Sequence, residues 1–184
     1  YCDAGSRRAD VLSMTKPKEL CFAALNDCAE RFCEDVSACL REAINQRGRT
    51  TLAVSGGSTP EHIFPILARK PLPWERVTVT LADERWVDRD HADSNEGLTR
   101  RLLLQGPAAQ ARFVGLKTEH ETPIDGHADT EATLATLDWP ADAMFLGMGA
   151  DGHIASLFPE MGNWLEAPGR ALAVAASGSR QPRM

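Results

Sequence analysis

The segment Thr51-Leu-Ala-Val-Ser-Gly-Gly-Ser-Thr-Pro60 decides the fold class. Residues 51–55 form a short apolar run that is typical of a buried strand, and the two glycines behind them indicate a tight turn. Thr59 can cap a helix that follows, and Pro60 suits the first turn of that helix. A strand that passes through a glycine turn directly into a helix predicts one unit of an α/β fold.

Residues upstream and downstream of this unit keep the alternation of helix and strand. Residues 17–47 have the apolar spacing of a long amphipathic helix, which Gly48 would end. The expected inner face of that helix consists of Leu25, Cys28, Phe32, Val36, Cys39, Leu40 and Ala43. Pro65 has no backbone donor, so we expect the helix after Thr59 to kink or to begin late.

Further elements follow at regular intervals along the chain. Apolar runs predict strands at 77–81, 112–116, 143–147 and 171–176. Asp93 and Glu96 have capping-box spacing for a helix that runs to about Gln105, and a weaker helical pattern covers 125–138. The apolar run 143–147 is expected in a central parallel strand. The whole pattern predicts an α/β fold with a doubly wound, mostly parallel sheet and helices on both faces.

Composition is that of an ordinary globular protein and excludes several function classes. The 184 residues, 43% hydrophobic and 25% charged, fit a single domain over residues 1–184. The net charge of −6 argues against a broad basic face for nucleic acid. No apolar run has the length of a membrane span, and the polar residues 1–10 do not resemble a signal peptide. Five cysteines without metal-site spacing indicate reduced thiols in a cytoplasmic protein that binds no metal.

Three unusual segments each follow a predicted strand, so a parallel sheet would bring them to one edge. The first is the turn Ser55-Gly-Gly-Ser58. Its glycines let backbone N–H groups approach a ligand, and the helix N-terminus behind them adds partial positive charge. This combination suits an anion such as phosphate, although a plain tight turn would have the same sequence.

The second segment is Ala82-Asp-Glu-Arg-Trp-Val87, a charged run at the end of a strand. Arg85 can bind phosphate through two parallel hydrogen bonds, and Asp83 can orient a water or a sugar hydroxyl. Asn95, farther along the same loop, can hydrogen-bond a sugar or act as a helix cap. A solvated loop with exposed ion pairs is the alternative interpretation.

The third segment is Gly147-Met-Gly-Ala-Asp-Gly-His-Ile-Ala-Ser-Leu-Phe-Pro159. It contains a G-x-G-x-x-G pattern, but no acidic residue stands at the offset that a dinucleotide-binding site requires. His153, directly after the glycines, is suited to act as a base near pH 7, and a structural histidine is the alternative. The chain lacks a G-x-S-x-G elbow, so nothing indicates a serine nucleophile.

The sequences of these three segments and their order along the chain, together with His-Ala-Asp-Ser-Asn-Glu at 91–96, closely resemble those of the bacterial 6-phosphogluconolactonase family. The resemblance runs from about residue 17 to the end of the chain. The related glucosamine-6-phosphate deaminases have a similar Asp-Gly-His segment, but theirs continues with Ala-Phe-Asn-Glu-Pro. This chain has Ala155-Ser-Leu-Phe-Pro159 instead, which favours the lactonases.

The resemblance implies hydrolysis of 6-phospho-D-glucono-1,5-lactone to 6-phospho-D-gluconate in the oxidative pentose phosphate pathway, with no cofactor. His153 would be the general base, Asp83 would organise the site, and Arg85 would bind phosphate. The expected substrate contacts are Ser55, Gly56, Gly57, Ser58, Arg85, Asn95, Gly149, Asp151 and Gly152. Backbone N–H groups from Gly149 to Gly152 are candidates for stabilising the oxyanion. We expect no nucleic-acid or membrane partner, and a monomer or weak homo-oligomer.

Members of the 6-phosphogluconolactonase family continue for several tens of residues past the position that corresponds to Met184. That further segment contains another strand, helices and a basic residue near the phosphate. We therefore expect residues 1–184 to form an incomplete domain that is, alone, unstable, poorly active, or both. Three other functions stay open. They are a related deaminase or isomerase, a sugar-phosphate-binding protein without activity, and a nucleotide-binding oxidoreductase that uses residues 147–152.

Overall fold

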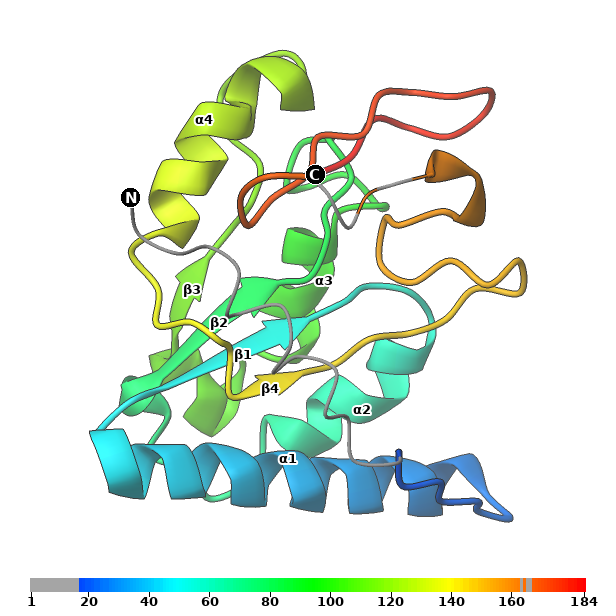
Figure 1. The fold of residues 1–184 in the computed structure, drawn as a ribbon. Coiled ribbons are helices and arrows are strands. Elements are labelled where there is room, and N and C mark those ends of the chain that lie inside the picture. The colour runs from blue at the N-terminus through cyan, green and yellow to red at the C-terminus, as the bar shows by residue number, and fades with distance from the viewer. Residues whose placement is uncertain (1–16, 163, 165–166) are drawn as a thin grey trace, which may run out of the picture.

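The computed structural model describes residues 17–162, 164 and 167–184 (Figure 1), so the interpretation of residues 1–10 lies outside the described residues. Four strands form one sheet in the order β3-β2-β1-β4, and all three neighbouring pairs are parallel. The strands are β1 (Thr50–Val54), β2 (Val77–Leu81), β3 (Arg112–Val114) and β4 (Ala143–Met144). Because these strands end at one edge, the segments that follow them meet there.

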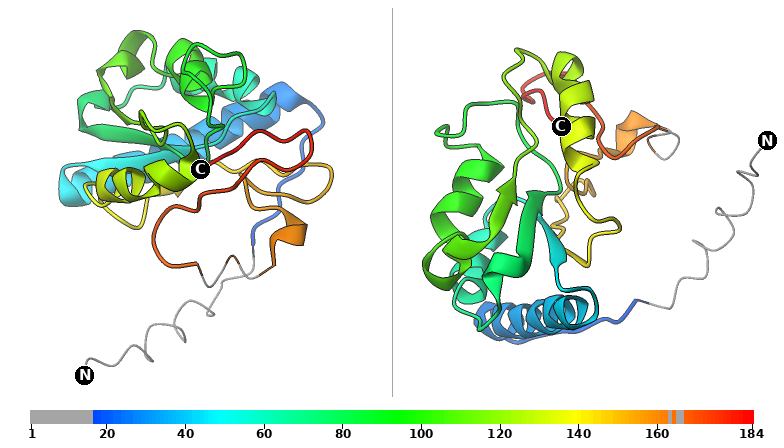
Figure 2. Two further views of the ribbon diagram at one scale, coloured as in Figure 1. Left: turned by 90° about the horizontal axis from the view of Figure 1, so that it is seen from above. Right: turned by 90° about the vertical axis from the view of Figure 1, so that its left-hand side faces the viewer.

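Helices cover both faces of the sheet. α1 (Leu25–Arg47) and α2 (Thr59–Leu67) lie on one face, where Phe145 packs edge-to-face on Phe32 and Phe64. α4 (Pro123–Leu134) lies on the opposite side of the sheet from α1 (Figure 1, Figure 2), and α3 (Asn95–Leu102) packs beside α2. Short 3-10 helices cover Trp74–Arg76, Gly106–Gln110 and Pro159–Met161. The predicted α/β class with a parallel sheet is confirmed.

The long first helix begins at Leu25 rather than at residue 17, and its inner face is rotated from the predicted one. Its buried residues are Ala29, Cys33, Ser37, Leu40, Ala43 and Ile44. Cys28 and Cys39 are exposed, so the prediction that they are core residues is wrong. The small side chains of the real inner face allow close packing on α2, where the Cys33 thiol donates to the Ile63 carbonyl at 3.5 Å. Ranking the residues by apolarity misses this inner face, because it gives too little weight to small residues such as Ala29 and Ser37.

The helix after the glycine turn begins at Thr59, with Ser58 as its N-cap, and continues past Pro65. It therefore does not begin late. The next helix is capped by Ser94, whose hydroxyl accepts from the Gly97 N–H at 3.0 Å, and not by the predicted pair Asp93 and Glu96. It ends at Leu102, before Gln105. Its start is fixed by a buried carboxylate described below, which sequence spacing does not reveal.

The last predicted strands are shorter than expected or absent. β4 covers only Ala143–Met144, is not fully buried and lies at the edge of the described sheet, so the prediction of a central strand at 143–147 is wrong for the described residues. Residues 171–176 form no strand; Val174 makes a single antiparallel bridge with Arg183. β3 and α4 also end before the predicted 116 and 138. None of the described helices is both long enough and apolar enough to cross a bilayer.

Candidate active site

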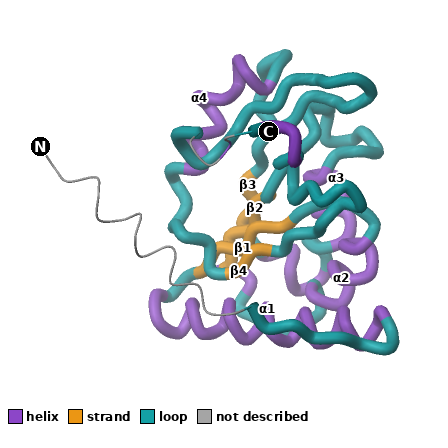
Figure 3. The backbone as a smooth tube through the Cα atoms, turned by 45° about the vertical axis from the view of Figure 1, so that its right-hand side comes forward, coloured by secondary structure: helices purple, strands orange, loops and turns teal. Residues whose placement is uncertain are grey.

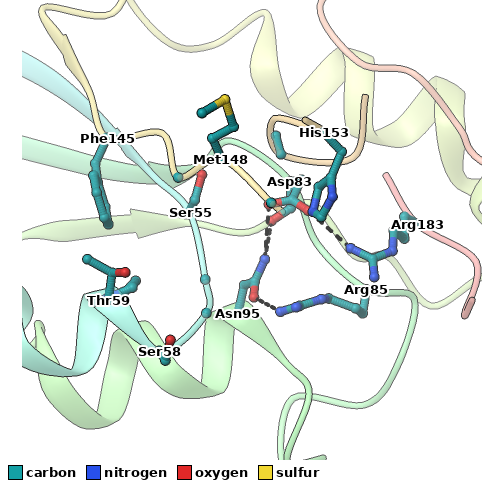
Figure 4. Close-up of a pocket in the computed structure, with 16 residues that line it drawn as sticks. Ser55, Ser58, Thr59, Asp83, Arg85, Asn95, Phe145, Met148, His153 and Arg183 are labelled. Atoms are coloured by element: carbon teal, nitrogen blue, oxygen red, sulfur yellow. Dashed lines mark hydrogen bonds and ion pairs between the residues drawn. The ribbon is translucent and has the colours of Figure 1, made fainter. Parts of the chain in front are cut away.

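A cavity of about 220 Å³ opens at the carboxyl edge of the sheet (Figure 4). Its walls come from the turn after β1, the loop after β2, the first residue of α3 and the loop after β4. All three segments singled out in the sequence therefore contribute to one cavity. Arg183, near the end of the chain, completes the wall of the cavity.

The turn after β1 brings bare backbone to the cavity. A side chain at Gly56 would place its Cβ only 1.7 Å from the Asn95 Oδ1 atom, so the close approach of these segments requires glycine. Gly57 has φ +108°, a conformation that favours glycine. The buried Ser55 hydroxyl lines the cavity and has no hydrogen-bond partner among the described residues. With the N-terminus of α2 behind it, this turn can accept an anion.

The loop after β2 supplies a guanidinium and a carboxylate. Arg85 donates to Asn95 Oδ1 and, at 3.2 Å, to the Asp93 carbonyl. No carboxylate pairs with Arg85 in the described part of the chain, which leaves its charge available to a ligand. Asn95 in turn donates to the Asp83 carbonyl at 2.8 Å and to the Asp83 carboxylate at 3.2 Å. These bonds hold Asp83, Arg85 and Asn95 in fixed relative positions (Figure 4).

The residue between Asp83 and Arg85 holds this loop on α3. Glu84 is 1% exposed, and its carboxylate accepts from the N–H groups of Arg85, Asn95 and Glu96 at 2.7 to 2.8 Å. It also accepts from the Ser94 hydroxyl at 3.2 Å. Burial raises the pKa of Glu84, while these hydrogen bonds oppose that rise. The carboxylate thereby satisfies free N–H groups at the start of α3.

The loop after β4 presents an imidazole to the cavity. The Nδ1 atom of His153 lies 2.5 Å from an Asp151 carboxylate oxygen, and this hydrogen bond lowers the pKa of Asp151. An ionised Asp151 requires Nδ1 to carry the proton, which leaves Nε2 free to accept one. A Cβ at Gly149 would lie 2.2 Å from the imidazole, so the ring occupies space that only glycine leaves open.

Asp83 connects the two sides of the cavity. It is 5% exposed, and its Oδ2 atom accepts from the Ser156 hydroxyl at 2.6 Å and lies 3.6 Å from a guanidinium nitrogen of Arg183. Sequence reasoning assigned no role to Glu84, Ser156 or Arg183. Glu84 could have been found from alternation, because in an extended segment it points away from Asp83 and Arg85. No sequence motif around Arg183 marks it as a site residue, because pairing with a distant segment of the chain brings it to the cavity.

Most of the predicted site residues lie together. The cavity is lined by Ser55, Gly56, Gly57, Ser58, Asp83, Arg85, Asn95, Gly149 and His153. Asp151 and Gly152 do not line it; Asp151 contacts His153 instead. The N–H groups of Gly149 and Gly152 donate to carbonyls of the same loop, so neither is available to a ligand. In the described ranges, no three His, Cys, Asp or Glu side chains are grouped so that they could hold a metal ion.

Fold and cavity place the chain among the α/β proteins with a ligand cavity at the carboxyl edge of a parallel sheet. Within this class the chain belongs to the family of glucosamine-6-phosphate isomerases/6-phosphogluconolactonase, whose model matches residues 23–184. This result confirms the resemblance seen in the three segments.

Relatives with assigned names agree with this family. A 6-phosphogluconolactonase of Pseudomonas aeruginosa is 45% identical over 147 residues, which are 80% of this chain and 59% of that protein. One from Rhizobium meliloti is 44% identical over 161 residues, covering 85% of this chain and 69% of the relative. The crystal structure of a 6-phosphogluconolactonase from Shewanella baltica matches with a TM-score of 0.84 and 37% identity, over 88% of this chain and 71% of that one. The chain thus spans less than two thirds of the length of the Pseudomonas aeruginosa relative.

Proposed function

We propose that this chain hydrolyses 6-phospho-D-glucono-1,5-lactone to 6-phospho-D-gluconate, a step of the oxidative pentose phosphate pathway. The observation that carries the proposal is the pairing of His153 with Asp151 beside a cavity that also holds Arg85 and the glycine turn. The relatives named above as 6-phosphogluconolactonases support the same substrate.

The proposed reaction uses a water molecule and His153. The Nε2 atom takes a proton from water as the water oxygen attacks the lactone carbonyl, and the ring C–O bond then breaks. The same proton passes from His153 to the departing ring oxygen, so the products are a carboxylic acid and a hydroxyl group. A lactone is an activated ester, so a general base and a fixed orientation suffice without a covalent intermediate.

Substrate orientation comes from the other end of the cavity. Arg85 and the turn at Gly56 and Gly57 would hold the phosphate, while Asp83 and Asn95 keep Arg85 in place. A phosphate held there fixes the sugar ring relative to His153. No cofactor enters this scheme.

We also propose a cytoplasmic protein that acts as a monomer or weak homo-oligomer on a small sugar phosphate. The described cysteines Cys21, Cys28, Cys33 and Cys39 are all free thiols, which suits a reducing compartment. Burial raises the pKa of the Cys33 thiol to about 11, so that thiol has little reactivity.

The test is a lactonase assay on the chain and on His153→Ala, with the spontaneous hydrolysis rate subtracted. General-base catalysis is worth about 10²–10⁴-fold, so His153→Ala should lose that factor in kcat. His120→Ala is a matched control, because His120 also lies 2.9 Å from an aspartate, Asp129, but does not line the cavity. Its activity should equal that of the unmodified chain.

Two outcomes would overturn the proposal. One is ammonia release from glucosamine 6-phosphate without lactone hydrolysis, which would make the chain a deaminase. The other is binding of 6-phosphogluconate with no turnover above the spontaneous rate, which would make it a binding protein.

A further inference from the structure

The loop that carries His153 is folded as a small unit of its own. Within it the Gly149 N–H donates to the His153 carbonyl at 2.8 Å, and Met148 forms an antiparallel bridge with Ile154. A tight turn follows, in which the Leu157 N–H donates to the Ile154 carbonyl at 2.9 Å. Because these contacts tie His153 to the turn, a movement of the turn would move the imidazole with it.

One hydrogen bond attaches this unit to the rest of the cavity. In the described ranges, the hydrogen bond that joins residues 147–157 to other parts of the chain is the one from the Ser156 hydroxyl to the Asp83 carboxylate. Met148 and Ile154 are exposed, so their side chains contribute little packing. The position of the unit therefore depends strongly on the bond between Ser156 and Asp83.

This bond is short and buried. Ser156 and Asp83 are both 5% exposed, and the Ser156 Oγ atom lies 2.6 Å from the Asp83 Oδ2 atom. A hydroxyl that donates to a carboxylate away from water forms a strong hydrogen bond. Asp83 is itself held by Asn95, which donates to its carbonyl at 2.8 Å and to its carboxylate at 3.2 Å. Ser156 thus attaches the unit that carries His153 to the opposite wall of the cavity.

The turn that presents Ser156 has space on both sides. Ala155 lines the candidate active-site cavity and also a second cavity of about 300 Å³, which Ser156 lines as well. Ala155 has φ +53°, a left-handed conformation that is uncommon for a residue with a side chain. Such strain persists only where surrounding contacts maintain it, and the bond from Ser156 to Asp83 is a contact that can do so.

We propose that Ser156 is a positioning residue, which sets the place of His153 relative to the substrate by docking residues 147–157 on Asp83. This inference deepens the proposed lactonase function and rests on it for the reaction. Ser156 acts through Asp83 and neither gives nor takes a proton during hydrolysis. Without the bond the imidazole would sample a wider range of positions, and a displacement of about 1 Å can cost about 10²-fold in rate.

The experiment compares Ser156→Ala with Ser156→Thr, which keeps the hydroxyl, and with the control Ser37→Ala. The second cavity gives the methyl group of threonine space beside Ser156. Ser37 is 4% exposed, much like Ser156, but its hydroxyl has no hydrogen-bond partner in the described part of the chain.

Three quantities are measured for each variant. They are kcat and KM on 6-phosphoglucono-1,5-lactone, affinity for inorganic phosphate by titration calorimetry, and hydrogen–deuterium exchange of the backbone amides over residues 148–157 and 84–96. The exchange in the second segment reports on the wall to which Ser156 is attached, so it distinguishes local loosening from a general loss of stability.

Ser156→Ala should lower kcat about 10- to 100-fold and leave KM and phosphate affinity unchanged, because Asn95 still holds Asp83. Amide exchange over residues 148–157 should become about tenfold faster, while exchange over 84–96 stays the same. Ser156→Thr should restore both kcat and slow exchange. Ser37→Ala should match the unmodified chain in every measurement.

Unchanged exchange over residues 148–157 in Ser156→Ala would overturn the inference, as would an unchanged kcat. A loss of phosphate affinity beside the loss of kcat would also overturn it, because Ser156 would then act on the phosphate-binding end of the cavity. If Ser156→Ala fails to fold, Ser156→Cys decides, since its thiol is a weak donor in a side chain of similar size. Exchange needs no turnover, so a chain without lactonase activity would refute the proposed function while exchange still decides the docking role of Ser156.

Discussion

Two regions face each other across the cavity and are built in different ways. The anion side comprises residues 55–59, 83–85 and 94–96, and the histidine side comprises residues 147–156. On the anion side, Glu84 and Asn95 are 1% exposed, and their side chains together take part in seven hydrogen bonds with other described residues or with each other. This side is attached to β1, β2 and α3, each at least five residues long.

The histidine side follows β4, a two-residue strand at the sheet edge. Beyond β4 the described backbone is mostly loop (Figure 3). Asp151 and His153 are both partly open to solvent, at 58% and 32% side-chain exposure. The contrast indicates that the anion side, which we propose binds phosphate, is preorganised, and that the histidine side, which we propose carries the general base, is held by few contacts. The following substitutions test whether the two halves can be weakened separately.

The largest effect is expected from Glu84→Ala on the anion side. The substitution leaves three backbone N–H groups and the Ser94 hydroxyl without their acceptor, and each unsatisfied buried donor costs about 1–3 kcal/mol. We expect a loss of at least about 4 kcal/mol in the free energy of unfolding, measured by urea denaturation.

Glu84→Gln keeps one acceptor oxygen and should lose less, while Glu121→Ala, at an exposed position, should change stability little. If Glu84→Ala unfolds at the same urea concentration as the unmodified chain, the anion side is not held by this carboxylate.

Asp142→Ala is the corresponding test of β4, the strand that leads into the histidine side. Asp142 stands before β4, where its carboxylate accepts from Thr50 Oγ1 at 2.7 Å and from the Thr51 N–H at 2.9 Å, and pairs with Arg47. Its loss should cost about 2–3 kcal/mol, because hydrogen bonds to charged groups are worth about 1.5–3 kcal/mol. We expect kcat to fall as β4 loosens, with phosphate affinity unchanged.

The pH dependence of this effect has a definite sign. Burial raises the pKa of Asp142, but the hydrogen bonds from Thr51, Thr50 and Arg47 outweigh burial and leave it below its usual 3.8. The stabilisation is therefore complete above pH 3.8 and is lost as the pH falls through the lower folded-state pKa. Urea curves at pH 7 and pH 3 should show a smaller difference between Asp142→Ala and the unmodified chain at pH 3. A difference that grows on acidification would contradict the assignment.

The sequence predicts the anion side better than the histidine side, for a physical reason. β1 and β2 are apolar runs of full strand length, and the glycine turn and the charged run stand directly behind them. The rule that parallel strands end at one edge then brings Gly56, Asp83 and Arg85 together. Packing of α3 is harder to predict, because its start depends on Glu84 rather than on the Asp93–Glu96 spacing.

The remaining features depend on contacts between residues distant in the chain. The run 143–147 is apolar throughout, which predicts a long central strand, but its pairing with β1 covers only Leu52 and Ala53. Arg183 enters the cavity through pairing with residues nearly 100 positions earlier, and no motif surrounds it. Local patterns therefore identify His153 and Arg85, while Ser156 and Arg183 are revealed only by the tertiary structure.

The smallest effect is expected from Asp151→Asn, which tests how the histidine side orients its base. Asparagine still offers an oxygen to Nδ1 of His153, but the interaction loses its charge. We expect kcat for the phosphorylated lactone to fall about tenfold, equivalent to about 1.4 kcal/mol in the barrier, with KM and phosphate affinity unchanged. Unfolding by urea should also be unchanged, since Asp151 is exposed.

Asp129→Asn, which alters the His120 pair outside the cavity, controls for general effects of removing an exposed carboxylate. A drop in phosphate affinity in Asp151→Asn would mean that the two sides of the cavity are coupled and would break the division drawn above, whereas an unchanged kcat would show that Asp151 does not orient His153.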